Sequence, residues 1–339
     1  MLNFSSILFI TGSGEDYLAD SILHGLRSLY GERVVDYPKC EPLYKNCSSS
    51  SFSRVRGHGF TLYKTLNDIE VDRFDIFSRL KAGEFDIVIF GNIQRSYATF
   101  VDWLPFLKSN ATILLDGEDT QFIAPYAGGW WRRKEYWLLP NAYKQFLYFK
   151  REWTPTTLHY RCFRLLPVSM CDYFYKKLNL HQISFSIPES KILKYPSQKT
   201  KDFTSHIVDQ EVAVLLKSDS TKYRFTEESE YYADLQASRF GITTKRAGWD
   251  CLRHYELAAN GCVPCFRDLD KKPEYCAPHG LNSENCITYT FADELIDKIH
   301  QITPAEYKEL QNGCIAWAGS NITSVKALAV LEALKTSIS

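Results

Sequence analysis

The sequence lacks an apolar run as long as a transmembrane helix. It also lacks an excess of either charge, with 40 basic and 40 acidic residues, which argues against nucleic-acid binding through overall charge. Its first ten residues lack the basic region and small-residue cleavage site of a signal peptide. We therefore expect a cytoplasmic protein, either free or in peripheral contact with the inner face of the membrane, and no nucleic-acid partner.

The ten cysteines are scattered along the chain, which indicates reduced thiols rather than a disulfide framework. Cys262 and Cys265 have the spacing of a zinc-binding pair, and Cys276 and Cys286 follow. However, the apolar residues around Pro264 predict a buried strand, in which residues three apart point to opposite faces. We therefore predict no metal site.

The first half of the chain alternates strand and helix patterns. A short apolar strand over 6–11 is followed by a glycine turn, a helical pattern over 16–30 and a second strand over 33–37. This is the βαβ unit of a doubly wound sheet. Further strands are predicted over 85–91 and 111–115.

A stretch rich in Pro, Lys and Ser at 188–205 predicts an interdomain linker. The alternation then resumes, with strands predicted over 212–216, 240–243 and 263–266. The pattern predicts an α/β protein of two Rossmann-like domains facing a cleft. The expected domains are residues 1–190 and 205–325, followed by the end of a C-terminal helix at 326–339.

A basic loop lies between the strand predicted over 240–243 and a helix predicted over 248–259. Backbone N–H groups at a helix N-terminus favour an anion. Thr244, Lys245 and Arg246 add donors and positive charge, and Gly248 permits close approach of the backbone. The loop therefore predicts a diphosphate site, although an N-capped helix with basic surface residues would have the same pattern.

The predicted helix would carry a polar stripe of Trp249, Arg253, Glu256 and Asn260, since residues three and four apart share a helix face. In this stripe Arg253 can pair with a phosphate, and Glu256 can accept hydrogen bonds from both hydroxyls of a ribose. A surface ion pair between these two side chains is the alternative. The residues predicted to bind this nucleotide ligand, called the donor below, are Gly14, Thr244, Lys245, Arg246, Gly248, Trp249, Asp250, Arg253, His254, Glu256, Asn260 and Asp268.

The segment RHYELAANGCVPCF, residues 253–266, resembles the R-x-x-E-A-x-A-A-G-C-V-P-V segment of GT-B glycosyltransferases, including exostosin-like and bacterial surface-glycan enzymes. The specific match covers about thirty residues in all, within Ser238 to Asp268. The DYPK sequence at 36–39 and the LDGED sequence at 115–119 also resemble proteins of bacterial glycan-biosynthesis loci. The resemblance implies a GT-B fold, a nucleotide-sugar donor linked to UDP, GDP or CMP, and a ribose contact by Glu256.

The sequence departs from this family in one respect. Many retaining members carry a second glutamate eight residues before the ribose-binding one, and here that position is Gly248. This favours an inverting reaction. The metal-independent chemistry general in GT-B enzymes implies neither a metal nor a cofactor. The expected acceptor is a glycan, free or lipid-linked, or another hydroxyl compound in surface polysaccharide synthesis.

An inverting transfer needs a base that removes the acceptor's proton. Asp16, Glu118 and Asp119 follow predicted strands of the first half, where catalytic loops are expected, and are the candidates. Helix capping by Asp16 and a solvated acidic turn at Glu118 and Asp119 are the structural alternatives. Lys150 and Arg151 are candidate contacts to phosphate or to the acceptor.

Two other functions fit parts of the sequence. Gly12 and Gly14 begin a dinucleotide fingerprint, which would indicate an NAD-dependent oxidoreductase, but Tyr17 occupies the place of its third glycine. A non-catalytic nucleotide- or glycan-binding protein is the third possibility. A nucleotide-sugar glycosyltransferase accounts for the most residues.

Overall fold

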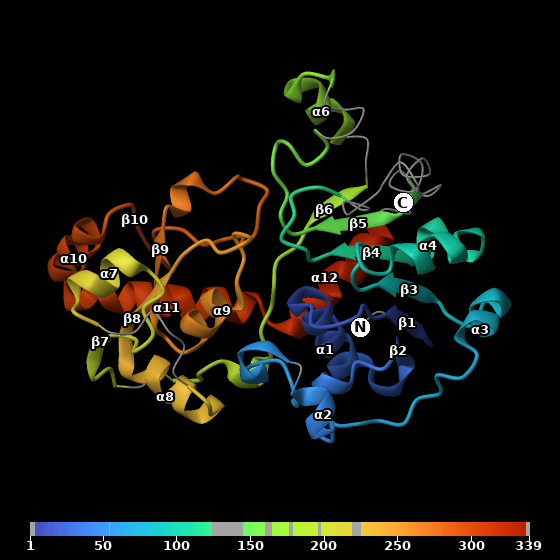
Figure 1. Ribbon diagram of the computed structural model, residues 1–339, viewed down its shortest axis with the longest axis horizontal. Coiled ribbons are helices and arrows are strands. Elements are labelled where there is room, and N and C mark those ends of the chain that lie inside the picture. Colours follow the sequence, from blue (N-terminus) through green and yellow to red (C-terminus); the bar gives the residue numbers. More distant parts are fainter. Residues whose placement is uncertain are drawn as a thin grey trace. The chain divides into compact units, whose positions relative to one another are not determined.

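The computed structural model describes residues 4–53, 55–123, 145–159, 165–175, 179–195, 198–218 and 225–336. Its internal contacts divide the chain into two compact units (Figure 1). Unit 1 contains Met1–Ser184, Pro273–Ala277 and Thr323–Ser339, and unit 2 contains Phe185–Lys272 and Pro278–Ile322.

Unit 1 is built on a six-stranded sheet in the order β2-β1-β3-β4-β5-β6, in which all neighbouring strands are parallel. The strand order reverses direction between β1 and β3, which is the usual place for a ligand in such sheets. The strands are β1 Ile7–Ile10, β2 Val34–Tyr37, β3 Ile87–Phe90, β4 Thr112–Asp116, β5 Leu147–Lys150 and β6 Leu180–Gln182. The helices include α1 Tyr17–Tyr30, α2 Ser49–Phe52, α3 Ile76–Ala82, α4 Tyr97–Trp103, α6 Val168–Tyr175 and α12 Thr323–Thr336.

The predicted βαβ unit is confirmed. Every residue of β1 and β3 is buried, as expected for central strands covered on both faces. Helix α1 begins after Asp16, whose side chain accepts hydrogen bonds from the backbone N–H groups of Leu18 and Ala19. The helix ends at Gly31, which has a φ of 57°.

The last helix, α12, belongs to unit 1 and packs against α1 (Figure 1). The two helices approach closely at Gly25, where a Cβ atom would lie 2.0 Å from the backbone oxygen of Thr323. This return of the C-terminal helix to the first half of the chain could not be predicted, because the sequence pattern of a helix does not identify its packing partner.

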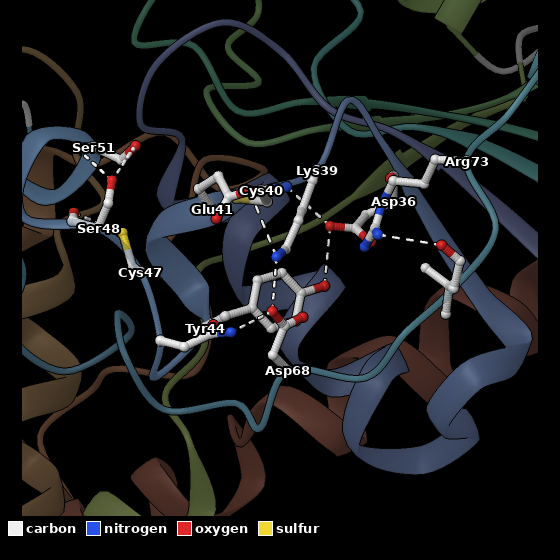
Figure 2. A network of polar contacts seen from close by, with 12 residues as sticks. Asp36, Lys39, Cys40, Glu41, Tyr44, Cys47, Ser48, Ser51, Asp68 and Arg73 are labelled. Atoms are coloured by element: carbon white, nitrogen blue, oxygen red, sulfur yellow. Dashed lines mark hydrogen bonds and ion pairs between the residues drawn. The ribbon is translucent and has the colours of Figure 1, made fainter.

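The Asp36 carboxylate anchors the segment that follows β2 (Figure 2). Asp36 is fully buried and accepts hydrogen bonds from Arg27 at 2.7 Å, Arg73 at 2.6 Å and the Tyr44 hydroxyl at 3.0 Å. The backbone N–H of Cys40 is a fourth donor, at 2.9 Å. The acid of the DYPK sequence thus has a structural explanation, since it ties three later parts of the chain to the sheet.

Unit 2 is built on a four-stranded parallel sheet in the order β10-β9-β8-β7. Two of its strands, β8 and β9, fall where they were predicted. The strands are β7 Lys201–Phe203, β8 Ser238–Thr243, β9 Val263–Arg267 and β10 Ile287–Tyr289. The helices include α7 Gln210–Leu215, α8 Glu228–Ala237, α9 Leu252–Ala259, α10 Ala292–Gln301 and α11 Pro304–Ser320.

The strand predicted over 212–216 is wrong, because these residues belong to α7 and its C-terminal cap. Asp209 caps this helix by accepting a hydrogen bond from the Glu211 backbone, and Val214 is 67% exposed. An apolar run of this length fits a strand or a short helix equally well. The first strand of the sheet is instead β7, inside the stretch predicted to be a linker, where its sequence KDF is too short and polar to give a strand signal.

None of the helices within the described ranges combines the length and apolar character needed to cross a bilayer.

Candidate functional site

The basic loop of unit 2 follows the carboxyl end of β8. Lys245 and Arg246 are exposed, Thr244 is half-buried, and Gly248 is buried. The loop is closed by a hydrogen bond from the Arg246 backbone N–H to the Gly248 carbonyl, at 3.0 Å. The Lys245 ammonium lies 5.1 Å from the centre of the Trp249 ring. The predicted cationic side chains are therefore available to a ligand.

Helix α9 begins at Leu252, four residues later than predicted. The predicted helical stripe is therefore wrong at both ends, since Trp249 precedes the helix and Asn260 is its C-terminal cap. Arg253 and Glu256 remain on one helix face, three residues apart. The sequence from Gly248 to Cys251 does not exclude a helix, so the later start of α9, after the extended backbone of Cys251, could not be recognised from the sequence.

Glu256 is held in place by a tyrosine. Its side chain is largely buried, with 7% exposure, and its Oε2 atom accepts a 2.6 Å hydrogen bond from the hydroxyl of Tyr231 on α8. The described residues form no ion pair between Arg253 and Glu256, so the surface salt bridge is not observed. A buried carboxylate oriented by a neutral donor keeps acceptor capacity for a ligand hydroxyl.

Arg253 has an unusual environment. Its Nη1 atom is buried without a hydrogen-bond partner among the described residues, and its Nη2 atom lies 3.5 Å from Nε2 of His206. A buried guanidinium N–H group without an acceptor costs free energy of folding. An anionic ligand that accepts a hydrogen bond from it would remove this cost. Sequence analysis missed His206, because nothing in its local pattern connects it with a helix 47 residues later.

Three predicted donor-binding residues have structural roles instead. His254 is fully buried, with Nδ1 2.9 Å from the Thr243 hydroxyl and Nε2 3.0 Å from the Trp249 carbonyl. Asp250 accepts hydrogen bonds from the Phe185 backbone and the Tyr255 hydroxyl. Asn260 donates to the Glu256 carbonyl and accepts from a glutamine side chain. These internal partners argue against direct donor contacts.

Asp268 belongs to unit 2, as the basic loop does, whereas Gly14 does not. Asp268 follows β9 in a left-handed conformation, with φ 58°, and pairs with Lys271 at 2.7 Å. The hydrogen bond from Lys271 holds the pKa of Asp268 below its usual range. Gly14 belongs to unit 1, where it is exposed and lies beside Arg95.

A second polar cluster lies in unit 1, where β1 and β3 end at the reversal of strand order. The Asn92 amide donates to both Asp16 and Glu118, with 2.8 Å to Glu118 Oε1. Arg95 donates to the same Glu118 oxygen at 2.6 Å and to the carbonyl oxygens of Ser13 and Glu15. The fold thus brings two of the three predicted catalytic acids together, through Asn92 and Arg95, which sequence analysis missed.

The two acids of this cluster differ in basicity. Burial raises the pKa of Asp16, although Arg95 and the hydrogen bonds to its carboxylate act in the opposite direction. Burial also raises the pKa of Glu118, but the Arg95 charge and the hydrogen bonds from Arg95 and Asn92 outweigh it and leave that pKa lowered. The Glu118 side chain is 30% exposed, whereas Asp16 is almost completely buried. Only Glu118 is open to an acceptor.

Asp119, Lys150 and Arg151 are engaged in ion pairs. Arg151 pairs with Asp119 and with Glu152, and its side chain is 1% exposed. Lys150 is fully buried 3.0 Å from Asp116 and donates to the Thr120 carbonyl. Burial lowers the pKa of Lys150, against the effect of Asp116. Because both cations are already neutralised inside unit 1, we do not retain them as contacts to phosphate or acceptor.

Within the described ranges, His, Cys, Asp and Glu side chains form no group of three that could hold a metal ion. Cys262 and Cys265 are both fully buried, and burial raises the pKa of each thiol. Protonated thiols are poor metal ligands.

Comparisons with known proteins identify the fold. No protein-family model matches the sequence, and no curated protein matches it either. Among solved structures, HepE from Anabaena in complex with UDP superposes with a TM-score of 0.56 and 9% identity, over 98% of this chain and 99% of HepE. Sucrose-phosphate synthase from Thermosynechococcus elongatus gives a TM-score of 0.54 and 12% identity, over 98% and 99% of the two chains. This chain therefore has the GT-B fold, built from two Rossmann-like α/β domains.

Proposed function

We propose that this protein is a glycosyltransferase that moves a sugar from a nucleotide-sugar donor to a hydroxyl acceptor. The observation that carries the proposal is the pair on α9, where Glu256 is oriented by Tyr231 and Arg253 has a buried N–H group without an acceptor. A nucleotide diphosphate offers ribose hydroxyls to the first and phosphate oxygens to the second. The fold shared with the UDP complex of HepE agrees with this proposal.

In the proposed donor site Glu256 accepts hydrogen bonds from the ribose hydroxyls, and Arg253 binds the phosphate groups with the backbone of the basic loop. Thr244, Lys245, Arg246 and Gly248 line this loop. Stabilising the departing nucleotide diphosphate in this way supplies the electrostatic part of catalysis, without a metal or cofactor. Trp249 and Asp268 are further donor contacts in the proposal.

The acceptor proton is removed in the cluster of unit 1. In the proposal Glu118 is the base, because its partly exposed carboxylate is accessible to the acceptor hydroxyl. Asn92 and Arg95 orient the Glu118 carboxylate. Asp16 positions Asn92 and caps α1. We propose an inverting transfer of a hexose or related sugar to a glycan or lipid-linked glycan in surface polysaccharide synthesis. The polysaccharide role rests on the resemblance of residues 253–266 and of the DYPK and LDGED sequences.

Thermal-shift measurements with nucleotide sugars test the donor class. UDP-, GDP- or CMP-linked sugars are expected to raise the melting temperature, because a ligand of the folded state stabilises it. NAD serves as the matched dinucleotide control and is expected to have no effect. Stabilisation by NAD alone would instead support an oxidoreductase, and no effect of any nucleotide sugar would refute the proposal.

Calorimetry with Glu256→Gln tests the ribose contact. We expect a roughly tenfold to hundredfold loss of UDP affinity, as for hydrogen bonds to a charged group. The same substitution should hardly change the affinity for 2′,3′-dideoxy-UDP, which lacks both hydroxyls. An equal loss for both ligands would place Glu256 away from the ribose. Release of UDP from a bound UDP-sugar would separate an enzyme from a binding protein.

A further inference from the structure

His206 lies in the loop between β7 and α7 and packs against the N-terminal turn of α9. It is 8% exposed, and its Nε2 atom is 3.5 Å from Nη2 of Arg253. Because a guanidinium only donates, this geometry requires a neutral His206 whose Nε2 carries no proton. A neutral imidazole therefore adjoins a cation that still has an unpartnered buried N–H group.

Acidic side chains in and beside this loop are already paired. Asp209 binds Arg267 at 3.0 Å and the Tyr289 hydroxyl at 2.8 Å. Asp234, on α8, binds Lys201 and the Ser205 side chain. Glu256 is bound by Tyr231, and the described residues form no ion pair with Arg253. Within the part of the chain that the structure describes, the positive charge beside His206 therefore has no paired carboxylate.

We propose that His206 is a second ligand of the donor's phosphate groups beside Arg253, and that it binds a proton when the donor binds. This inference rests on the proposed donor site of unit 2. The proton comes from solvent and is added at Nε2, while Nδ1 keeps its own. The resulting N–H group donates to a phosphate oxygen, and the contact between Nε2 and Arg253 is replaced by contacts of both cations with the phosphate.

The direction of the coupling follows from the charges around the imidazole. Without ligand, the Arg253 cation disfavours a second positive charge on His206. A bound phosphate group reverses this balance, because an opposite charge favours the protonated form. The complex therefore holds more protons than the free protein and UDP, so that the affinity falls as the pH rises through the range in which the bound histidine titrates.

Calorimetry of UDP binding at pH 7.5, in two buffers of different ionisation enthalpy, measures the protons taken up. We expect the wild type to take up at most one proton more per bound UDP than His206→Gln does. Comparing the two proteins cancels the protons that UDP itself exchanges. His206→Gln should also weaken UDP binding roughly tenfold, with uridine binding unchanged. His300→Gln, which alters an exposed histidine on α10, is the matched control and should behave as the wild type.

Two results would overturn the inference, and they are distinguishable. If the wild type binds UDP and His206→Gln has the same affinity and proton uptake, His206 is not a phosphate ligand, whereas the donor site stands. If the wild type does not bind UDP, the proposed UDP site fails with the inference. Should the variant not fold, the wild type alone suffices, since after correction for free UDP it must take up protons with UDP and none with uridine.

Discussion

The hydroxyl of Tyr231 donates a 2.6 Å hydrogen bond to Oε2 of Glu256, linking α8 to α9 across 25 residues of sequence. Both side chains are largely buried, so the phenol fixes the direction of the carboxylate before any ligand arrives. Tyr231 is thus a positioning residue for the proposed ribose contact. Because the carboxylate is already oriented, less conformational entropy is lost when the ligand binds.

Tyr231→Phe removes this hydrogen bond while leaving the ring in place. We expect UDP affinity to fall roughly fivefold to tenfold, because Glu256 loses its orientation. The affinity for 2′,3′-dideoxy-UDP should not change, which a general disturbance of the fold would not reproduce. Tyr232→Phe, at the neighbouring half-buried position, is the control for both calorimetric titrations. Equal losses for UDP and its dideoxy analogue would contradict the positioning role.

Glu118→Gln tests the proposed base. The amide keeps the size of the side chain but cannot take a proton, so turnover of a UDP-sugar is expected to fall roughly 100-fold or more with UDP affinity unchanged. Asp119→Asn is the matched neighbour and should retain most activity. Asp16→Asn preserves the preferred capping chemistry of α1 and should reduce turnover less than Glu118→Gln. The opposite order of the two losses would make Asp16 the base.

Asp20 predicts how the stability of unit 1 depends on pH. Burial raises its pKa to about 7, despite the hydrogen bond from the Tyr63 hydroxyl at 2.6 Å. Between about pH 4 and pH 7 the unfolded carboxyl is ionised while the folded one keeps its proton, so the folded state binds more protons and stability falls as the pH rises. The expected slope from this group approaches about 1.4 kcal/mol per pH unit.

Urea titrations at several pH values between 4.5 and 7 measure the free energy of unfolding. The upper end of this range is the raised pKa of Asp20, about 7. Asp20→Asn removes the titrating proton and should flatten this part of the curve. Asp102→Asn, which alters an exposed carboxylate on α4, is the control and should leave the slope unchanged. Parallel curves for the wild type and Asp20→Asn would show that Asp20 ionises normally.

Gly25 and Gly319 form a matched pair of helical glycines with opposite expected effects. At Gly25 a methyl group would lie 2.0 Å from the Thr323 backbone oxygen, so Gly25→Ala must push α12 away from α1 and should cost about 1–3 kcal/mol of stability. At Gly319, on α11, a methyl group meets no atom within 4 Å. Gly319→Ala should therefore stabilise the protein by up to about 1 kcal/mol. Thermal unfolding measures both, and a neutral Gly25→Ala would contradict the close packing of α1 and α12.

Local patterns determined much of this fold. The buried runs of β1 and β3, the Asp16 cap of α1 and the strands β8 and β9 could be read from the sequence, because burial period and capping act over a few residues. The nucleotide-sugar ligand was expected on a different ground, the resemblance of residues 253–266 to GT-B glycosyltransferases. The start of α9 and the nature of α7 were not determined locally, since their sequences satisfy more than one backbone conformation.

Tertiary structure decided which side chains meet. Only the sheet order of unit 1 brings Asn92 and Arg95 to Asp16 and Glu118, and only the packing of β7 and α9 in unit 2 brings His206 to Arg253. Tertiary packing also buried Lys150 and Arg151, which the sequence offered as ligand contacts. Hydrogen bonds and charges act over a few ångströms of space, and a linear pattern reports spatial neighbours only within one helix or strand. The sequence by itself therefore determined most of the elements and, through its resemblance to GT-B glycosyltransferases, the class of ligand to expect, whereas the fold determined the partners of each charged group.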